Sequence, residues 1–242
     1  MRRWQVLMFG GLLGVASLWL VPFEVLLPQI QFTAGLRLLS LIQPAVLTLV
    51  AVLVGHYLAP KVGLGAPVVD AALTKSSVTA ALRHIFPLAS LAGLASALIL
   101  VVHALYVVPE IGRASSLGAR LSTFEMPLLT KMLYGGITEE LLTRWGLMSL
   151  FAWLGWRLAG RPERPKNVVF WFAIISSALI FALGHLPLLM MISPNPQSWL
   201  VAAVLLGNTI PGILFGWLFW RNGIEAAILA HMLAHLISTY LT

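Results

Sequence analysis

The segment GGITEELLTRWG (135–146) places two carboxylates and a guanidinium inside an otherwise apolar stretch. Glu140 and Arg144 are four residues apart, so on a helix they share one face and can form an ion pair. Glu139 is rotated from them by about 100°, because an α-helix has 3.6 residues per turn. An ion pair that only fixes helix packing would explain Glu140 and Arg144. It would leave Glu139 as an additional carboxylate, free to face another partner.

Three histidines follow in two later apolar segments. FALGH (181–185) ends in His185, and HMLAH (231–235) begins with His231 and ends in His235. His231 and His235 are also four residues apart, so both imidazoles project from one helix face, about 6 Å apart along the axis. Metal sites use pairs of histidines in this geometry.

Together these groups suit hydrolysis by an activated water molecule. Glu139 can act as the general base on the water, and His185 can position the water or share its proton. Histidines that donate hydrogen bonds can stabilise the oxyanion that forms when an amide carbonyl becomes tetrahedral. The chain has no cysteine, and no serine stands in a recognisable nucleophile elbow. Direct attack by water is therefore favoured over covalent catalysis.

The composition indicates where these groups lie. Of 242 residues, 60% are hydrophobic and 10% are charged, and the mean hydropathy is +0.94. A soluble domain is about half apolar and about a quarter charged. We therefore expect a polytopic, all-α transmembrane bundle with a polar cavity within the bilayer, forming one membrane domain over residues 1–242. Since a span needs about 20 apolar residues, seven windows qualify: 4–22, 38–59, 86–108, 130–154, 168–192, 199–220 and 223–241. An eighth span is the alternative.

Depth in the membrane links the ionisable groups. Measured from the outer ends of their spans at 1.5 Å per residue, Glu139 lies about 12 Å deep. His185 and His235 lie about 9 Å deep, and His231 about 15 Å deep. Three helices thus bring titratable groups to one level, which predicts one shared polar site. Asn208, in GNTIPG (207–212), is expected to line this site or to satisfy the backbone that Pro211 frees.

The basic residues predict the orientation. The net charge is +7, but the basic residues fall in short loops, which indicates anionic lipid headgroups and not nucleic acid. Since Lys and Arg are retained on the cytoplasmic side, a count of ten against four predicts a cytoplasmic N-terminus, in the plasma membrane. The first span resembles a signal peptide without a small-x-small cleavage site, so we expect an uncleaved anchor. The ten are Arg2, Arg3, Lys61, Lys75, Arg83, Arg157, Arg161, Arg164, Lys166 and Arg221, and the four are Arg37, Arg113, Arg120 and Lys131.

EELLTR (139–144), FALGH and HMLAH match the motifs EExxxR, FxxxH and a third, histidine-led motif, in this order on successive late spans. In this set the chain resembles the CPBP family of intramembrane proteases, named for CAAX-protein and bacteriocin processing and also called the Abi family. The resemblance covers residues 125–242, which would form the catalytic core. It implies a CAAX prenyl protease-like hydrolase that cleaves a peptide bond of a membrane-associated or lipidated substrate.

The resemblance also implies roles for single residues. Glu139 would be the base that activates water, and His185 would be its partner. Arg144 would pair with Glu140 and hold the shape of the site. His231 would serve the oxyanion or a metal.

One position departs from the family's pattern. Prenyl-protein proteases of this group commonly carry Asn four residues after the third-motif histidine, where this chain has His235. A histidine can also titrate or bind a metal. A mechanism without a cofactor is favoured, because a catalytic zinc usually needs a further carboxylate as base and Glu140 is occupied by Arg144. The alternative is a metallo-type enzyme with a zinc set of Glu139, His185, His231 and His235.

Two other classes of function compete with an intramembrane protease. Glu, Arg and His inside a membrane also mark proton relays, as in a proton-coupled transporter. Paired inverted repeats with broken helices would favour a transporter, and we find none in the sequence. A non-catalytic membrane scaffold that binds a partner or lipid in the same cavity is the third possibility.

Overall fold

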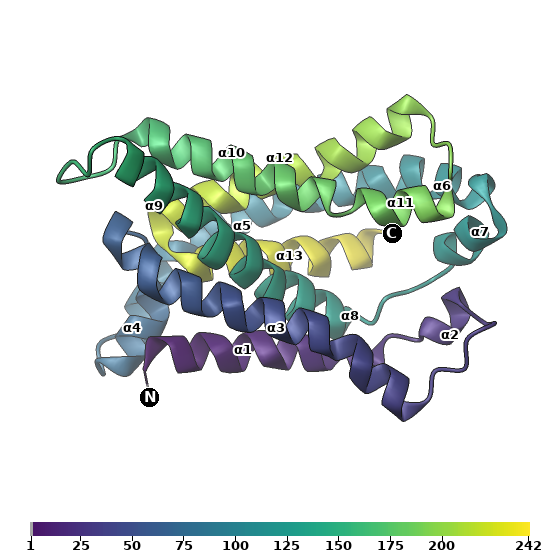
Figure 1. Cartoon of the computed structure of the whole chain (residues 1–242), viewed down its shortest axis with the longest axis horizontal. Helices are drawn as coiled ribbons and strands as arrows, with labels where there is room; N and C mark the ends of the chain where they lie inside the picture. The colour runs from purple at the N-terminus through teal and green to yellow at the C-terminus, as the bar shows by residue number, and fades with distance from the viewer. Residues whose placement is uncertain (1) are drawn as a thin grey trace.

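The structure, a computed structural model, describes residues 2–242 apart from the side chain of Leu26, and these residues form helices without any β-strand (Figure 1). The expectation of an all-α fold is thus confirmed. The helical segments, of which η1 and η2 are 3₁₀ turns and η3, η4 and η5 are π-helical, are α1 (Arg3–Ser17), η1 (Leu18–Leu20), α2 (Phe23–Leu26), α3 (Ala34–Leu58), η2 (Ala59–Val62), α4 (Pro67–Leu73), α5 (Val78–Val102), η3 (His103–Val107), α6 (Val108–Ala114), α7 (Ser116–Ser122), α8 (Leu128–Thr130), η4 (Lys131–Glu139), η5 (Leu141–Met148), α9 (Ser149–Leu158), α10 (Asn167–Leu183), α11 (Leu186–Ile192), α12 (Ser198–Asn222) and α13 (Ile224–Leu241).

Six helical stretches of the described chain are long and apolar enough to cross a membrane: Arg3–Leu20, Ala34–Val62, Val78–Ala114, Asn167–Ile192, Ser198–Asn222 and Ile224–Leu241. They correspond to six of the seven windows expected from the sequence. The seventh window, 130–154, is helical as part of α8 to α9, but it is not among the six. It carries the EELLTR charges, which make it less apolar than the other stretches.

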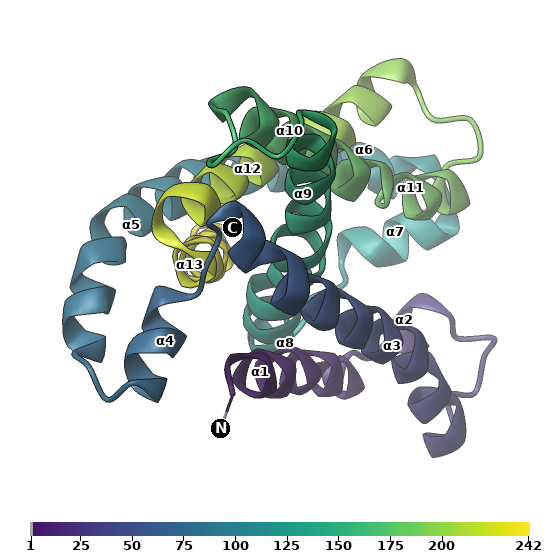
Figure 2. The ribbon, with the colours of Figure 1, turned by 60° about the vertical axis from the view of Figure 1, so that its left-hand side comes forward.

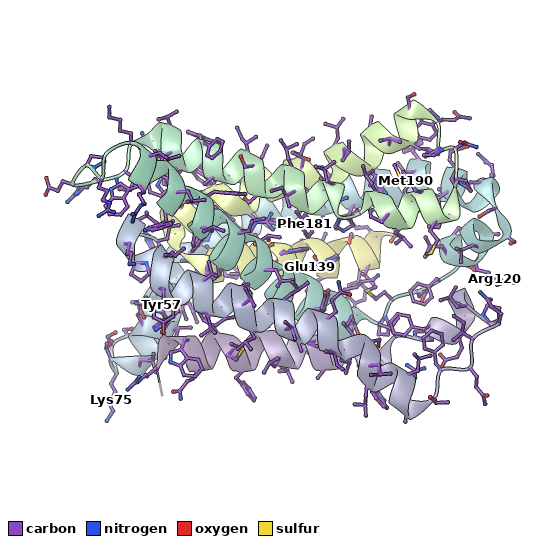
Figure 3. The ribbon with its side chains drawn as sticks, viewed as in Figure 1. Tyr57, Lys75, Arg120, Glu139, Phe181 and Met190 are labelled. Carbon is purple, nitrogen blue, oxygen red and sulfur yellow. The ribbon has the colours of Figure 1, made fainter. Side chains whose placement is uncertain are left out.

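The outer surface of the bundle is apolar. Leu38 on α3 is 59% exposed and Leu91 on α5 is 65% exposed, and large apolar side chains on α10 are exposed in the same way. Figure 3 shows such side chains projecting outward along the length of the helices. A soluble monomer rarely exposes so much contiguous apolar surface, whereas a lipid environment accommodates it.

Helix α13 lies at the centre of the bundle and packs against α5, α12 and η4 (Figures 1 and 2). Its buried face is rich in alanine, which lets neighbouring backbones approach closely. On α5, a Cβ atom at Gly93 would lie 2.9 Å from the carbonyl oxygen of Ala230 and 2.8 Å from Cβ of Leu233. This close contact fixes the position of HMLAH, which follows Ala230 directly.

Helix α1 packs against η4, the segment that ends in Glu139. The hydroxyl of Thr138 donates to the carbonyl of Gly11 at 2.8 Å, and the hydroxyl of Thr130 donates to the carbonyl of Ser17 at 2.8 Å. The first helix is therefore part of the bundle that holds the EELLTR segment.

This contact leads to a prediction for two neighbouring glycines of α1. A Cβ atom at Gly14 would overlap the carbonyl oxygen of Leu133 and the hydroxyl of Thr138, whereas one at Gly10 would meet only Cγ2 of Ile137, at 3.6 Å. We expect Gly14→Ala to lower the free energy of unfolding by about 1–3 kcal/mol, the usual cost of overpacking. Gly10→Ala is the matched control and should leave it unchanged or slightly raised, because alanine favours a helix. Thermal unfolding in detergent measures both, and equal melting temperatures for the two variants would contradict the prediction.

The two ends of the bundle differ in their basic residues. The N-terminus, α4 and the loop after α9 lie at one end, while α2, α6 and α7 lie at the other (Figure 1). At the first end, Arg3 and Asp70 form a two-pronged ion pair, with N–O distances of 2.6 and 2.7 Å, that ties the start of α1 to α4.

Candidate active site

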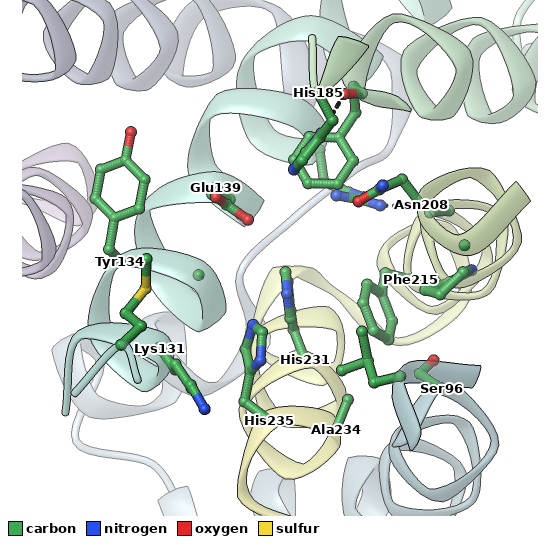
Figure 4. Close-up of a pocket in the computed structure, with 18 of the residues that line it drawn as sticks. Ser96, Lys131, Tyr134, Glu139, His185, Asn208, Phe215, His231, Ala234 and His235 are labelled. Carbon is green, nitrogen blue, oxygen red and sulfur yellow. Dashed lines mark hydrogen bonds between the residues drawn. The ribbon is translucent and has the colours of Figure 1, made fainter. Parts of the chain in front are cut away.

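A pocket of about 270 Å³ lies where η4, η5, α10, α12 and α13 meet (Figure 4). It is lined by five of the six ionisable residues selected from the sequence, and Glu140 is the exception. The lining includes Glu139, Arg144, His185, His231 and His235 together with Lys131, Tyr134, Phe181, Asn208 and Phe215.

Glu140 lies behind the pocket wall and is fully buried. Its Oε1 atom accepts a hydrogen bond from Nη1 of Arg144 at 2.9 Å, so the expected i, i+4 ion pair is confirmed. The same oxygen lies 2.8 Å from Nδ1 of His231. Because a carboxylate only accepts, Nδ1 of His231 carries a proton, and Nε2 has a free lone pair when the ring is neutral.

Arg144 connects η5 to α12 and is 1% exposed. Besides Glu140, its Nη1 atom donates to the hydroxyl of Thr143 at 2.6 Å, and its Nη2 atom donates to the carbonyl of Gly212 at 3.0 Å. Its guanidinium carbon lies 5.5 Å from the centre of each of the Phe181 and Phe215 rings, within the range of a cation–π contact. The positive charge of Arg144 is thus compensated by neighbouring groups of the protein.

Glu139 is in a different position from Glu140. Within residues 2–242 its carboxylate forms no ion pair and no hydrogen bond, and it lines the pocket. In Figure 4 it is directed into the space between His185 and the two histidines of α13. Glu139 is the last residue of the π-helical segment η4, and wide turns of this kind are frequent at functional sites. The carboxylate is therefore available to a molecule in the pocket.

His185 lies just after α10 ends, where the chain turns into α11. Its Nδ1 atom is 2.9 Å from the carbonyl oxygen of Phe181. A carbonyl only accepts, so Nδ1 carries a proton, and Nε2 is an acceptor when the ring is neutral. This nitrogen can receive a hydrogen bond from a water molecule next to Glu139.

The two histidines of α13 form a stacked column with an aromatic ring. His231 lies between Phe215 and His235, with ring centres 4.9 Å apart on either side and ring planes inclined by 25°. The common face expected from their i, i+4 spacing is confirmed. His235 forms no side-chain hydrogen bond in the described part of the chain, so the N–H of its neutral ring is free.

The absence of a side chain at Gly135 leaves space for the rings of His231 and His235. A Cβ atom at Gly135 would lie 2.8 Å from Nε2 of His235 and 3.8 Å from Nε2 of His231. We expect Gly135→Ala to displace His235 and to lower the activity of the site about tenfold to a hundredfold, as small misplacements in active sites do. Gly65→Ala is the control, because no atom lies within 4 Å of a Cβ atom at Gly65. Equal activity of the two variants would show that the position of His235 is irrelevant.

A zinc ion would require Glu139, His185, His231 and His235 to converge as one ligand set. Within the described residues, no group of three or more His, Cys, Asp and Glu side chains is placed to hold a metal ion. His231 gives Nδ1 to Glu140, so only its Nε2 atom is left for a further ligand, and its ring stacks on that of His235. The arrangement does not fit the zinc set, and we derive no step through a metal.

Four further polar residues line the pocket: Ser96, Lys131, Tyr134 and Asn208. In the sequence, Lys131 counts only as a basic residue of an outer segment, and on an α-helix it would be rotated by about 80° from Glu139. Asn208 lines the pocket, which is the first of its two expected roles. Its Nδ2 atom donates to the carbonyl of Val204 at 2.8 Å and not to that of Gly207, the carbonyl that Pro211 leaves without a helical donor.

Comparison with known proteins agrees with the motif pattern. Residues 121–237 match a family model described as type II CAAX prenyl endopeptidase Rce1-like. The matched segment contains EELLTR, FALGH and HMLAH, and the match confirms the resemblance to the CPBP proteases. No curated protein and no solved structure matches the chain. The family and the six apolar stretches make this an integral membrane protein.

Proposed function

We propose that the protein is an intramembrane endopeptidase that acts on a membrane-associated or lipidated substrate. The proposal starts from the match of residues 121–237 to the Rce1-like family of type II CAAX prenyl endopeptidases. The observation that carries the proposal is the free carboxylate of Glu139, which faces histidines in a pocket of the family segment. Such an unpaired group inside a membrane bundle costs free energy and is typical of functional sites.

The proposed reaction begins with a water molecule between Glu139 and His185. Nε2 of His185 accepts one hydrogen bond from the water, and Glu139 takes its other proton. The hydroxide then attacks the carbonyl carbon of the scissile peptide bond and forms a tetrahedral oxyanion. As the carbon–nitrogen bond breaks, protonated Glu139 returns the proton to the leaving amine.

The oxyanion needs N–H donors. His235 has a free N–H, and Asn208 has a second amide hydrogen besides the one on Val204, so we assign these two residues to the oxyanion. His231 has an acceptor at Nε2 as long as its ring is neutral. It can donate to the oxyanion only as an imidazolium, a form that Glu140 would stabilise.

We also propose how the protein lies in the membrane. The helical run from α8 to α9 would be the seventh span, because it packs inside the bundle against α1, α3, α10 and α13, where neighbouring helices shield its charges. The end that carries the N-terminus, α4 and the loop after α9 would face the cytoplasm of the plasma membrane, since it holds most of the basic residues. The chain would be one membrane domain, with residues 125–242 as its catalytic core.

An apolar pocket beside the site supports a lipidated substrate. It has a volume of about 520 Å³ and lies between the loop after η1, α2, α7 and α11. Met126 lines both this pocket and the candidate active site. Ligand pockets of about 300–1,000 Å³ bury a small molecule well, so a lipid chain attached to the substrate would occupy the apolar pocket while the peptide reaches Glu139.

The test compares protein termini in membranes of cells that make wild type or Glu139→Gln at equal levels. New N- or C-termini that appear only with wild type would support an endopeptidase and identify the substrate. Identical termini under conditions that induce the protein would contradict it. Transport activity that is lost in Glu139→Gln without any cleavage would favour the proton-coupled carrier, and neither activity would favour a scaffold.

A further inference from the structure

Lys131 is a positively charged residue in the pocket lining, and no acidic residue of the described chain pairs with it. It is the first residue of η4 and lines the pocket with Glu139 and the histidines. Its Nζ atom donates to the hydroxyl of Thr239 at 3.1 Å, and within residues 2–242 it takes part in no ion pair. An ammonium has three N–H donors, so two remain for a ligand.

The other cation of the pocket has no such capacity. Arg144 is neutralised by Glu140 and bonded to Thr143 and Gly212. Figure 4 shows the ammonium of Lys131 near His235, on the side away from Glu139. An anion that enters the pocket therefore meets Lys131 as the available positive charge.

We propose that Lys131 binds a carboxylate of the substrate, supplied by its C-terminus or by an acidic side chain, and so determines which peptides are cleaved and where. This inference rests on the endopeptidase function proposed above. Lys131 would be a substrate-binding residue, and the bond between the ammonium and the carboxylate would be charge-assisted.

The position of Lys131 limits where that carboxylate lies. Lys131 and Glu139 are eight residues apart on one helical run, a rise of roughly 12 Å for an α-helix and less for a π-helical one. An extended peptide covers roughly 3.3–3.6 Å per residue. A carboxylate on Lys131 would thus place the scissile bond only a few residues away, so Lys131 would select bonds close to the carboxylate.

The test uses wild type, Lys131→Gln and Lys131→Arg in lipid nanodiscs. The probes are farnesylated peptides with the C-terminal pattern Cys-aliphatic-aliphatic-X, ending in a free carboxylate, in an amide, or in an amide after a C-terminal glutamate. We expect wild type to cleave the free acid roughly 10- to 100-fold better than the plain amide in kcat/KM, mainly through KM, which is the usual effect of a bond to a charged group. Lys131→Gln should lose this preference, and Lys131→Arg should retain it.

The third peptide distinguishes the two sources of the carboxylate. Cleavage of the glutamate peptide at the rate of the free acid would show that an acidic side chain is sufficient, and cleavage at the rate of the plain amide would assign Lys131 to the C-terminus. Lys75→Gln is the matched control, because Lys75 lies at the opposite end of the bundle from Arg120 and is exposed (Figure 3). It should leave all rates unchanged.

A binding measurement tests this inference separately from the proposed function. On the Glu139→Gln background, which cannot cleave by the proposed mechanism, the free acid should bind more tightly than the amide, and Lys131→Gln should remove the difference. Preferential binding without cleavage by wild type would support Lys131 and overturn the endopeptidase. Equal binding or equal cleavage of the acid and the amide by wild type would overturn the role of Lys131. A loss of binding in Lys131→Gln that is the same for both peptides and depends on anionic lipid would overturn it too.

Discussion

Glu139→Gln should reduce peptide-bond hydrolysis by about 10²–10⁴-fold, the usual contribution of a general base, while the protein stays folded. Glutamine keeps the shape of the side chain but cannot take a proton from water. Because the Glu139 carboxylate has no hydrogen bond or ion pair to lose among the described residues, the melting temperature should not fall below that of wild type. Initial rates with a farnesylated peptide and a thermal unfolding curve measure the two effects.

The two readouts must be taken together. Loss of activity without a fall in the melting temperature supports Glu139 as the base. Wild-type rates in Glu139→Gln would exclude it from this role, and the group that activates water would then have to be sought elsewhere, including in a bound metal. Glu139→Asp is a useful intermediate, because it keeps the carboxylate but withdraws it by one methylene group, so its rate should fall between the other two.

Glu140→Gln should have the opposite pattern, with a large loss of stability accompanying the loss of activity. Glu140 is fully buried, and its Oε1 atom binds both Arg144 and His231. Removing its charge leaves the guanidinium of Arg144 uncompensated in the interior, which costs about 3–5 kcal/mol. It also replaces the carboxylate that holds the ring of His231 by a neutral amide oxygen, which is a weaker acceptor. The melting temperature in detergent and the rate on the same peptide measure both losses.

A double variant separates the two effects of Glu140. Arg144→Gln, added to Glu140→Gln, removes the unpaired buried charge, so much of the stability should return. The activity should not return, because His231 still lacks its carboxylate. If Glu140→Gln alone is as stable as wild type, the ion pair seen in the structure does not bear on folding.

Contacts within one helix could be predicted from the sequence. The pair of Glu140 with Arg144 and the common face of His231 with His235 follow from i, i+4 spacing, and both are present in the structure. The all-helical fold follows from the composition. The bond between Glu140 and His231 joins residues that are 91 positions apart, and no local periodicity encodes a contact at that separation.

The window 130–154, which the sequence predicts to be a span, is not among the six apolar stretches of the structure. Hydropathy separates lipid-facing helices from loops because most spans are apolar on all sides. The run from α8 to α9 is enclosed by other helices and carries the paired charges of Glu140 and Arg144 inside the bundle. These two charges lower its mean hydropathy although neighbouring helices shield them from lipid. The docking of α1 on η4 was equally hidden, because the sequence shows the glycine at position 14 but not the Leu133 carbonyl that it faces.

The contact between α1 and η4 has a consequence for the evolution of this site and for its engineering. The family match begins at residue 121, yet the threonines on either side of Lys131–Ile137 are held by carbonyls of Gly11 and Ser17. A transplant of the matched segment alone into another membrane protein would carry every motif and still lack these two supports. The smallest portable unit of this site is therefore discontinuous in sequence, and recombination between relatives would have to exchange the first helix together with the last ones.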